Sequence, residues 1–207
     1  MAEVRFVVPY PEKMSRGLLL LRTFFGWLYV AIPHAFCLCF IGLAAVIAQF
    51  IAFWVVLFTG QYPRSLFEFV ANMMQWQLRV SVYLNFLHDD YPPFSMYDFH
   101  PTELTIEYPD RLSRLHLLGR IFFGWLYIMI PHGFCLYFRG IAHVIVTFVA
   151  WWVVLFTGAM PQDMHRFLVG TYRWQARLNA YVCFLTDEYP PFSGRPEAGP
   201  IETGVPV

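Results

Sequence analysis

Two histidines in long apolar stretches are the residues best placed to do chemistry. His34 and His132 each follow a proline and lie among aliphatic and aromatic residues. Ionisable side chains inside a membrane are functional candidates, and two facing histidines could ligate a haem or transfer a proton. The competing interpretation is structural, since a histidine after a kinking proline can donate to the carbonyl group that the proline leaves free. Neither repeat offers a second histidine pair at helical spacing, which favours the structural interpretation.

An acidic, proline-rich motif is the second candidate. It runs Asp-x-Tyr-Pro-Pro-Phe, lies ten positions after an arginine, and occurs twice. The residues are Arg79, Asp89, Tyr91, Pro92, Pro93 and Phe94, and then Arg177, Asp187, Tyr189, Pro190, Pro191 and Phe192. Paired prolines hold an extended segment, which could dock a cytoplasmic partner. Alternatively, the acidic residues fold back onto the arginine, and we expect this pairing because its spacing is the same in both copies. The predicted contacts are Arg79 with Asp89 or Asp90, and Arg177 with Asp187 or Glu188.

Composition and motif content argue against several functional classes. The net charge is zero and no basic stripe is present, which argues against nucleic-acid binding. The sequence contains no phosphate-binding loop, zinc-binding helix or nucleophile elbow. The four cysteines lack the spacing of a disulfide framework or a zinc site. We therefore expect a non-enzymatic protein with no catalytic residue, no cofactor, no metal and no nucleic-acid partner.

Both candidate motifs recur because the chain is a tandem repeat. The offset is 98 residues, as between His34 and His132 (132 − 34 = 98), and 47 of the 91 pairs between residues 5–95 and 103–193 are identical. The alignment needs no gap, which indicates two copies of one fold. We expect a first membrane repeat over residues 1–97, a second over 98–195 and a flexible tail over 196–207.

The hydrophobic composition indicates an integral membrane protein. Hydrophobic residues make up 58% of the chain and charged residues 14%, against about 25% charged residues in soluble domains. About 20 apolar residues cross a bilayer, so each repeat is long enough for two crossings. The first span of each repeat begins after a serine N-cap, Ser15 or Ser113. The predicted fold is all-α, with two helical hairpins whose four transmembrane spans cover residues 16–40, 43–59, 114–138 and 141–157.

The turn of each hairpin has two possible positions. One is Pro33, because the residue before a proline avoids helical geometry. The other is near Gly42, with the proline left as a kink inside the first span. In the second repeat, a turn at the proline would carry Arg139 and His143 into the lipid, where a charge costs at least ~2.5 kcal/mol. A turn near Gly140 lets Arg139 reach the far interface, which favours the second position.

Two further helices and two short extended segments are predicted outside the hairpins. Apolar residues recur every three or four positions over residues 66–87 and 164–185. This pattern predicts an amphipathic helix in each repeat, lying in the membrane interface. Residues 5–10 and 103–108 alternate weakly between apolar and polar, so we expect them to be extended, and the two segments could pair with each other.

The basic residues predict the orientation in the membrane. Nearly all arginines and lysines lie outside the hairpins, whose tips carry only Arg139. By the positive-inside rule, both termini and both amphipathic helices are cytoplasmic. The two copies then enter the membrane in the same orientation, so we expect them to be related by an axis along the membrane normal.

The motifs together resemble one known family. In the first copy they are Arg16, Arg22, Pro33, His34, Phe58, Thr59, Gly60, Pro63, Trp76, Arg79 and the segment from Asp89 to Phe94. This pattern is similar to that of a bacterial membrane family catalogued only as a domain of unknown function, in which tandem copies occur. The resemblance covers nearly the whole chain twice and implies a multi-pass protein of the bacterial inner membrane. It implies no activity, cofactor or catalytic residue.

The first functional hypothesis is an accessory or scaffold subunit of a larger membrane assembly. Its aromatic-rich apolar faces exceed what four spans need for internal packing, so its partners would be the lipid bilayer and other subunits or copies of the chain. The second hypothesis is a small transport or lipid-binding unit, since pseudo-symmetric repeats can enclose a site. The third is a haem-binding or redox subunit, on His34 and His132 alone.

Overall fold

Two long helices dominate the structure, a computed structural model that describes residues 3–196. They run from Arg16 to Thr59 and from Arg114 to Thr157, and each is long and apolar enough to cross a membrane. The predicted tail lies outside the described residues from residue 197 on. The segments of the long helices are α1 (Arg16–Gly26), η1 (Trp27–Ala31, a π-helical segment) and α2 (Ile32–Thr59), then α4 (Arg114–Gly124), η2 (Trp125–Met129, also π-helical) and α5 (Ile130–Thr157).

The predicted hairpin turns are wrong, because helical residues continue without interruption through Pro33 and Gly42. The π-helical segment just before Pro33 adds a residue to the turn and accommodates a proline that cannot donate a hydrogen bond. A Cβ added at Gly42 would meet no described atom within 4 Å, so this glycine marks neither a turn nor a close contact. The described chain thus has two long helices in place of four spans. At 1.5 Å per residue, each is about 66 Å long, roughly twice the thickness of a bilayer core.

The ends of the long helices carry recognisable caps. The Ser15 side chain accepts a hydrogen bond from the backbone N–H of Leu18 at 3.3 Å, and Ser113 caps the second helix in the same way. Both N-caps were predicted. At the other ends, Gly60 and Gly158 have φ values of 76° and 75°, a left-handed conformation that glycine adopts without steric cost.

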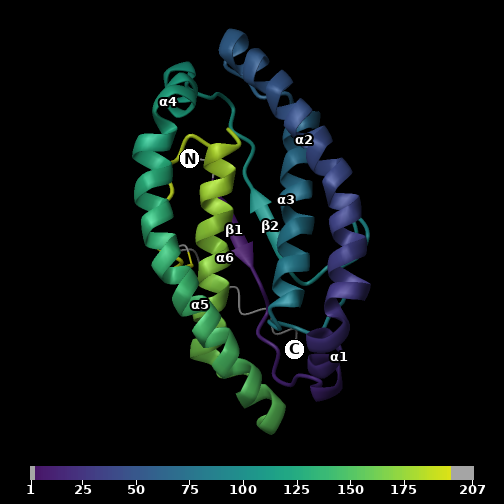
Figure 1. Ribbon diagram of the computed structural model, residues 1–207. Coiled ribbons are helices and arrows are strands. Elements are labelled where there is room, and N and C mark those ends of the chain that lie inside the picture. The colour runs from purple at the N-terminus through teal and green to yellow at the C-terminus, as the bar shows by residue number, and fades with distance from the viewer. Residues whose placement is uncertain (1–2, 197–207) are drawn as a thin grey trace, which may run out of the picture.

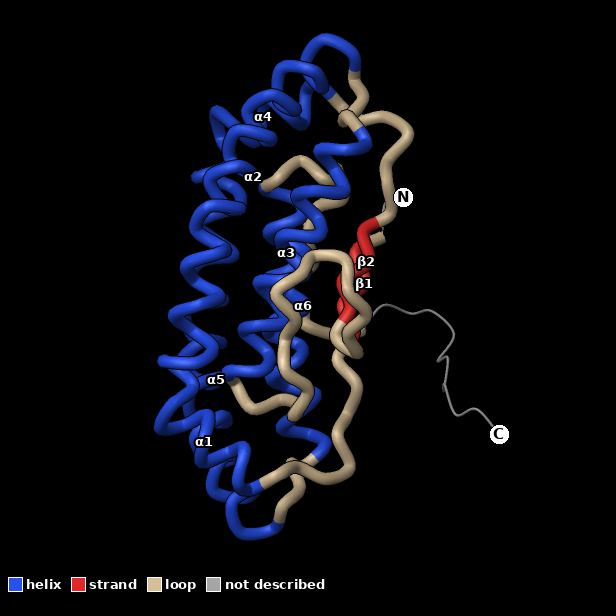
Figure 2. The backbone as a smooth tube through the Cα atoms, turned by 90° about the vertical axis from the view of Figure 1, so that its right-hand side faces the viewer, coloured by secondary structure: helices blue, strands red, loops and turns tan. Residues whose placement is uncertain are grey.

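A second layer of helices lies between the long helices and a small sheet (Figure 2). It consists of α3 (Arg64–Leu84) and α6 (Gln162–Val182), which end three residues before the predicted positions. Val70, Arg79 and Val82 are all buried although they point to different sides of α3. These helices are therefore covered by the long helices on one side and by the sheet on the other, so they pack on more than the single apolar side that their periodicity indicated.

The small sheet reveals how the two repeats are related. β1 (Val4–Val7) and β2 (Glu103–Ile106) pair with each other, as the sequence allowed, and the pairing is antiparallel with Phe6 opposite Leu104. These two residues are equivalent positions of the repeat (104 − 6 = 98), so a twofold axis passes between them and stands perpendicular to the sheet. Figure 1 looks along this direction and shows the long helices running antiparallel, with α1 beside α5 and α4 beside α2.

The repeats exchange their N-terminal arms, which we define as residues 3–15 and 101–113. β1 packs on α6 and β2 packs on α3, so each arm lies on the other repeat. The backbone N–H of Met14 donates to the carbonyl of Gly158, and that of Leu112 donates to Gly60, both at 2.8 Å. The Tyr10 hydroxyl donates to the carbonyl of Met160 in the other repeat at 2.6 Å. The two repeats therefore form one interlocked body.

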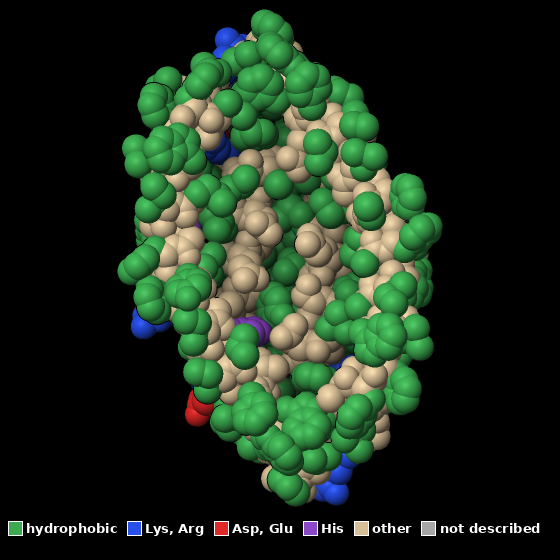
Figure 3. All heavy atoms as spheres, in the orientation of Figure 1, with side chains coloured by type: hydrophobic (Ala, Val, Ile, Leu, Met, Phe, Trp, Pro, Cys, Tyr) green, Lys and Arg blue, Asp and Glu red, His purple; other side chains and the backbone are tan. Residues whose placement is uncertain are grey.

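Large apolar side chains cover the outer side of both long helices from end to end (Figure 3). Phe24, Phe36, Phe50 and Phe58 are 63–71% exposed, and the equivalent phenylalanines of the second helix are exposed to the same degree. No charged residue occurs between positions 24 and 58. We call this outer surface of residues 24–58 and 122–156 the apolar face.

Candidate functional site

The two candidate motifs meet on the inner side of each long helix. Pro33 has no N–H, so the carbonyl of Tyr29, four residues earlier, lacks the donor that an α-helix would supply. The Tyr91 hydroxyl donates to that carbonyl at 3.1 Å. In the second repeat, the Tyr189 hydroxyl donates to the Tyr127 carbonyl at 2.9 Å. The Tyr-Pro-Pro-Phe segment therefore supplies a donor where the proline has none.

His34 lies beside this segment and is closed in by aromatic side chains. Trp76 Nε1 donates to His34 Nδ1 at 3.0 Å. An indole N–H is only a donor, so the histidine is neutral and carries its proton on Nε2. The Phe94 ring stacks on the imidazole with 3.9 Å between centroids and 6° between planes. His34 is fully buried by these contacts.

We call the aromatic rings that enclose each histidine the aromatic cage. In the second repeat, Trp174 donates to His132 Nδ1 at 3.0 Å and Phe192 stacks on the imidazole at 4.0 Å between centroids. Each histidine contacts aromatic rings of its own repeat. Haem ligation would need a free nitrogen lone pair, whereas Nδ1 accepts from the indole and Nε2 carries the proton. Within residues 3–196, no group of three or more His, Cys, Asp or Glu residues could hold a metal ion.

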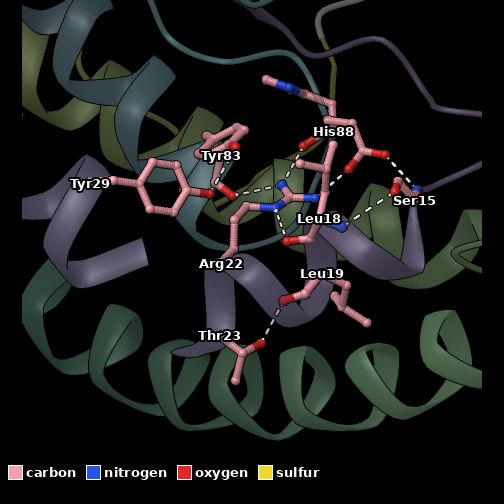
Figure 4. Close-up of polar contacts among 9 residues, drawn as sticks. Ser15, Leu18, Leu19, Arg22, Thr23, Tyr29, Tyr83 and His88 are labelled. Carbon is pink, nitrogen blue, oxygen red and sulfur yellow. Dashed lines mark hydrogen bonds and ion pairs between the residues drawn. The ribbon is translucent and has the colours of Figure 1, made fainter. Parts of the chain in front are cut away.

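The acidic residue of the motif pairs with an arginine of the long helix (Figure 4). The Arg22 side chain is fully buried and forms an ion pair with Asp89. Its guanidinium also donates to the carbonyls of Tyr83 at 3.1 Å and of His88 at 2.6 Å. Asp89 accepts a further hydrogen bond from the backbone N–H of Ser15 at 2.6 Å. One ion pair thus joins the start of the long helix, the end of α3 and the Tyr-Pro-Pro-Phe segment.

The ion pair is repeated in the second copy. Arg120 pairs with Asp187 and donates to the Tyr181 carbonyl at 2.8 Å. Asp187 accepts from the backbone N–H of Ser113 at 2.6 Å. The guanidinium also lies over the Tyr181 ring, 4.0 Å from its centroid, which adds a cation–π contact.

The predicted pairing of Arg79 and Arg177 with the acidic residues is wrong. Arg79 Nε donates to the Thr102 carbonyl at 3.1 Å, and Arg177 donates to the carbonyls of Ser193 and Arg195 at 3.3 and 3.0 Å. Both arginines hold the segment that follows the motif. The acidic residues instead turn toward the long helix, where Asp89 pairs with Arg22 and Asp187 pairs with Arg120.

A buried histidine borders the first ion pair. Burial lowers the pKa of His88 to about 3, with smaller effects from the nearby His100 and Arg22, so the imidazole is neutral. Its Nε2 shares a hydrogen bond with the Thr102 hydroxyl at 2.9 Å. Burial also raises the pKa of Tyr83, whose hydroxyl is therefore protonated at neutral pH. The ion pair, the tyrosine hydroxyl and the indole N–H of each site bind within the chain and hold the segment in place, an arrangement suited to positioning.

The roles of four residues were missed in the sequence: Arg22, Arg120, Trp76 and Trp174. All are identical between the copies, which is a signal that could have found them. About half of the aligned positions are identical, however, so identity between repeats alone does not distinguish a buried ion pair from ordinary packing.

Arg139 does not lie at a hairpin tip, as was predicted, but within the continuous helix α5. Its Nε donates to the Thr171 hydroxyl at 3.0 Å and its NH2 donates to the Phe167 carbonyl at 3.1 Å. The expected interface at the hairpin tip does not exist, because residue 139 is in the middle of a continuous helix. The side chain therefore turns inward to α6, and Ile41 stands at the equivalent position of the first repeat.

Two segments of the chain, residues 21–96 and 120–194, match one and the same family model, described as Domain of unknown function (DUF4389). Each match contains one complete copy of the ion pair, the aromatic cage and the Tyr-Pro-Pro-Phe segment. No curated protein and no solved structure matches the chain.

Proposed function

We propose that this chain, which belongs to the DUF4389 family through both of its repeats, lies in the plane of a membrane as a non-enzymatic scaffold. In this arrangement the apolar face enters one leaflet, and the sheet with the Tyr-Pro-Pro-Phe segments faces water. The apolar face is the observation that carries the proposal, since it is continuous over both long helices.

The length of the apolar face favours an in-plane placement over a crossing. Phe24 and Phe58 are 34 residues apart, which is about 51 Å of helix at 1.5 Å per residue. The hydrocarbon core of a bilayer is only about 30 Å thick. Fitting 51 Å into it would need a tilt of about 54°, beyond the roughly 0–40° of transmembrane helices. A helix lying flat is about 10–12 Å thick and fits within one leaflet.

The polar side of the molecule favours the same placement. The sheet runs alongside the helical layers, and the side chains of Arg5 and Glu3 near it are 53% and 36% exposed. If the long helices stood upright, these charges would enter the hydrocarbon with them, at a cost of about 2.5–3.5 kcal/mol each. An in-plane placement leaves them in water.

The twofold axis agrees with this orientation. Because it stands perpendicular to the layers, it would run along the membrane normal, and both repeats would present the same face to the lipid. The positive-inside rule then favours the cytoplasmic leaflet of a bacterial inner membrane, with both termini in the cytoplasm.

The scaffold role rests on how the chain uses its side chains. The polar residues of both motifs bind within the chain, while aromatic side chains such as Trp27 and Trp125 remain exposed on the apolar face. These aromatic side chains offer contact area to other subunits of a membrane assembly or to further copies of the chain.

Polarised infrared spectroscopy of the full chain in oriented bilayers tests the placement. We expect amide dichroism of helices lying near the membrane plane. Upright helices, with a tilt inside the roughly 0–40° range, would contradict it. Phe50→Lys should weaken binding to vesicles more than tenfold, because it places a charge in hydrocarbon. Phe99→Lys is the matched control, since Phe99 is 88% exposed in a loop outside the apolar face.

Gentle detergent purification followed by mass spectrometry tests the scaffold role. We expect subunits or further copies of the chain at fixed stoichiometry. A solitary monomer would contradict this role and leave the lipid-binding hypothesis, which one cavity favours independently.

A further inference from the structure

A hollow lies between the long helices on the side of the apolar face (Figure 3). We call it the lipid-side hollow; its volume is about 540 Å³, within the range of small-molecule sites. Trp151 and Trp152 contribute to its wall from α5, and the end of α3 contributes Phe86. Its polar lining residues are Thr23, Asn85, His143 and Thr147.

The hydrogen bonds of the lining determine where the proton of His143 resides. Asn85 Nδ2 donates to the Ser81 carbonyl at 2.9 Å, so Asn85 Oδ1 is the atom that can accept. That oxygen lies 3.4 Å from His143 Nε2. His143 therefore carries its proton on Nε2, and Nδ1 is an acceptor. In the described part of the chain, His143 Nδ1 is buried and has no hydrogen-bond partner.

A second polar group without a partner stands one helical turn away. The hydroxyl of Thr147 is buried and makes no hydrogen bond with any residue of 3–196. Residues four apart lie on the same face of a helix, so Thr147 and His143 both line the hollow from one face of α5. Unsatisfied polar groups in an apolar surrounding cost free energy, which a suitable ligand would recover.

The polar lining draws Thr23 and Asn85 from the first repeat and His143 and Thr147 from the second, and it has no symmetric counterpart across the twofold axis. The positions equivalent to His143, Thr147 and Thr23 hold Ala45, Gln49 and Ile121. The hollow therefore has chemistry that the duplicated structural motifs do not share, and the twofold symmetry of the fold does not require it.

We propose that the lipid-side hollow binds one uncharged lipid with a free hydroxyl group, of the diacylglycerol class. The lipid hydroxyl donates to His143 Nδ1 and accepts from the Thr147 hydroxyl, and because both atoms are buried in the structure, the two side chains rotate toward the hollow when the lipid binds. An acyl chain lies against Trp151 and Trp152. None of the described residues that line the hollow is Asp, Glu, Lys or Arg, so a charged headgroup would be desolvated there without a partner. With the in-plane placement proposed above, the floor of the hollow is on the water side, which matches the direction of a lipid headgroup in a leaflet.

Tryptophan quenching in detergent micelles tests this binding without depending on the placement in a bilayer. The probes are a diacylglycerol with brominated acyl chains and its O-methyl ether, which lacks the hydroxyl hydrogen. We expect the full chain to be quenched at a three- to tenfold lower concentration of the diacylglycerol than of the ether. Trp151→Phe combined with Trp152→Phe should remove the difference between the two probes, whereas the quenching of Trp27 and Trp125 on the apolar face should be the same for both.

Variants locate the hydroxyl contact. In Thr147→Val and in His143→Leu, the ether and the diacylglycerol should quench at about the same concentration, so that the ratio of the two concentrations falls to about one. Thr157→Val is the matched control, because the Thr157 hydroxyl bonds the Val153 carbonyl at 2.7 Å and lies outside the hollow. Equal quenching of the wild-type chain by both probes, or by brominated phosphatidylcholine, would overturn the proposal even if a variant failed to fold. The proposal would also be overturned if both variants fold and the diacylglycerol still quenches them at a lower concentration than the ether does. If the infrared experiment showed upright helices, that result would refute the in-plane placement and leave the binding of the diacylglycerol to be decided by the quenching experiment.

Discussion

Breaking the ion pair between Arg22 and Asp89 should unfold the molecule at a markedly lower temperature. Arg22→Met keeps the apolar stem and removes the donors to Asp89 and to the carbonyls of Tyr83 and His88. Removing one partner of a buried pair typically costs 3–5 kcal/mol. The Asp89 side chain is 26% exposed and keeps its bond to Ser15, so we expect about 3 kcal/mol, at the low end. For a chain of this size that corresponds to about 6–12 °C in melting temperature.

Thermal unfolding in detergent, followed by circular dichroism, measures this loss. Adding Asp89→Asn to Arg22→Met should recover part of the stability, because it removes the carboxylate left without its partner. Arg64→Met is the control, since Arg64 forms an ion pair with Glu68 in which both side chains are largely exposed, and it should change stability by less than ~1 kcal/mol. An unchanged melting temperature for Arg22→Met, or a double variant no more stable than the single one, would refute the reasoning.

Two further predictions concern packing and pH. A Cβ added at Gly194 would lie 2.1 Å from the Gly170 carbonyl oxygen, so Gly194→Ala should lower stability by about 1–3 kcal/mol in thermal melts. Gly119→Ala, where no described atom lies within 4 Å, should be neutral or stabilising; equal losses would contradict this. Burial lowers the pKa of His88 to about 3 and that of His165 to about 4, so between about pH 6.5 and 4 the unfolded chain binds more protons. The free energy of unfolding should therefore fall as pH falls through this window, by up to ~1.4 kcal/mol per pH unit for each histidine. Denaturant melts that do not change from pH 7 to 5 would contradict this prediction.

The features that sequence could predict are those set by local or repeated patterns. The 98-residue offset indicated two copies of one fold, and serine before an apolar run located the N-caps at Ser15 and Ser113. The two short extended segments were also found from their alternation, and their pairing, which the sequence left open, is observed. The second-layer helices were found from their periodicity, although their burial on several sides was not.

The four-span prediction failed because it divided the apolar length by the thickness of a bilayer. That division assumes that each helix stands along the membrane normal, and 44 continuous helical residues do not fit the assumption. Within the site, spacing along α3 favoured Arg79 as the partner of Asp89. The true partner, Arg22, lies 67 residues before Asp89, and no local pattern specifies a contact at that separation.

The exchange of N-terminal arms means that one repeat is incomplete as a structure. A single copy would leave the side of α3 that β2 covers open, and its own arm would have no helix on which to pack. A chain with one copy could satisfy both needs only as a symmetric dimer whose arms cross between subunits. Covalent linkage of the two copies makes this association intramolecular, so it no longer depends on protein concentration. It also allows the two copies to differ in sequence, and the polar residues of the lipid-side hollow are one place where they do.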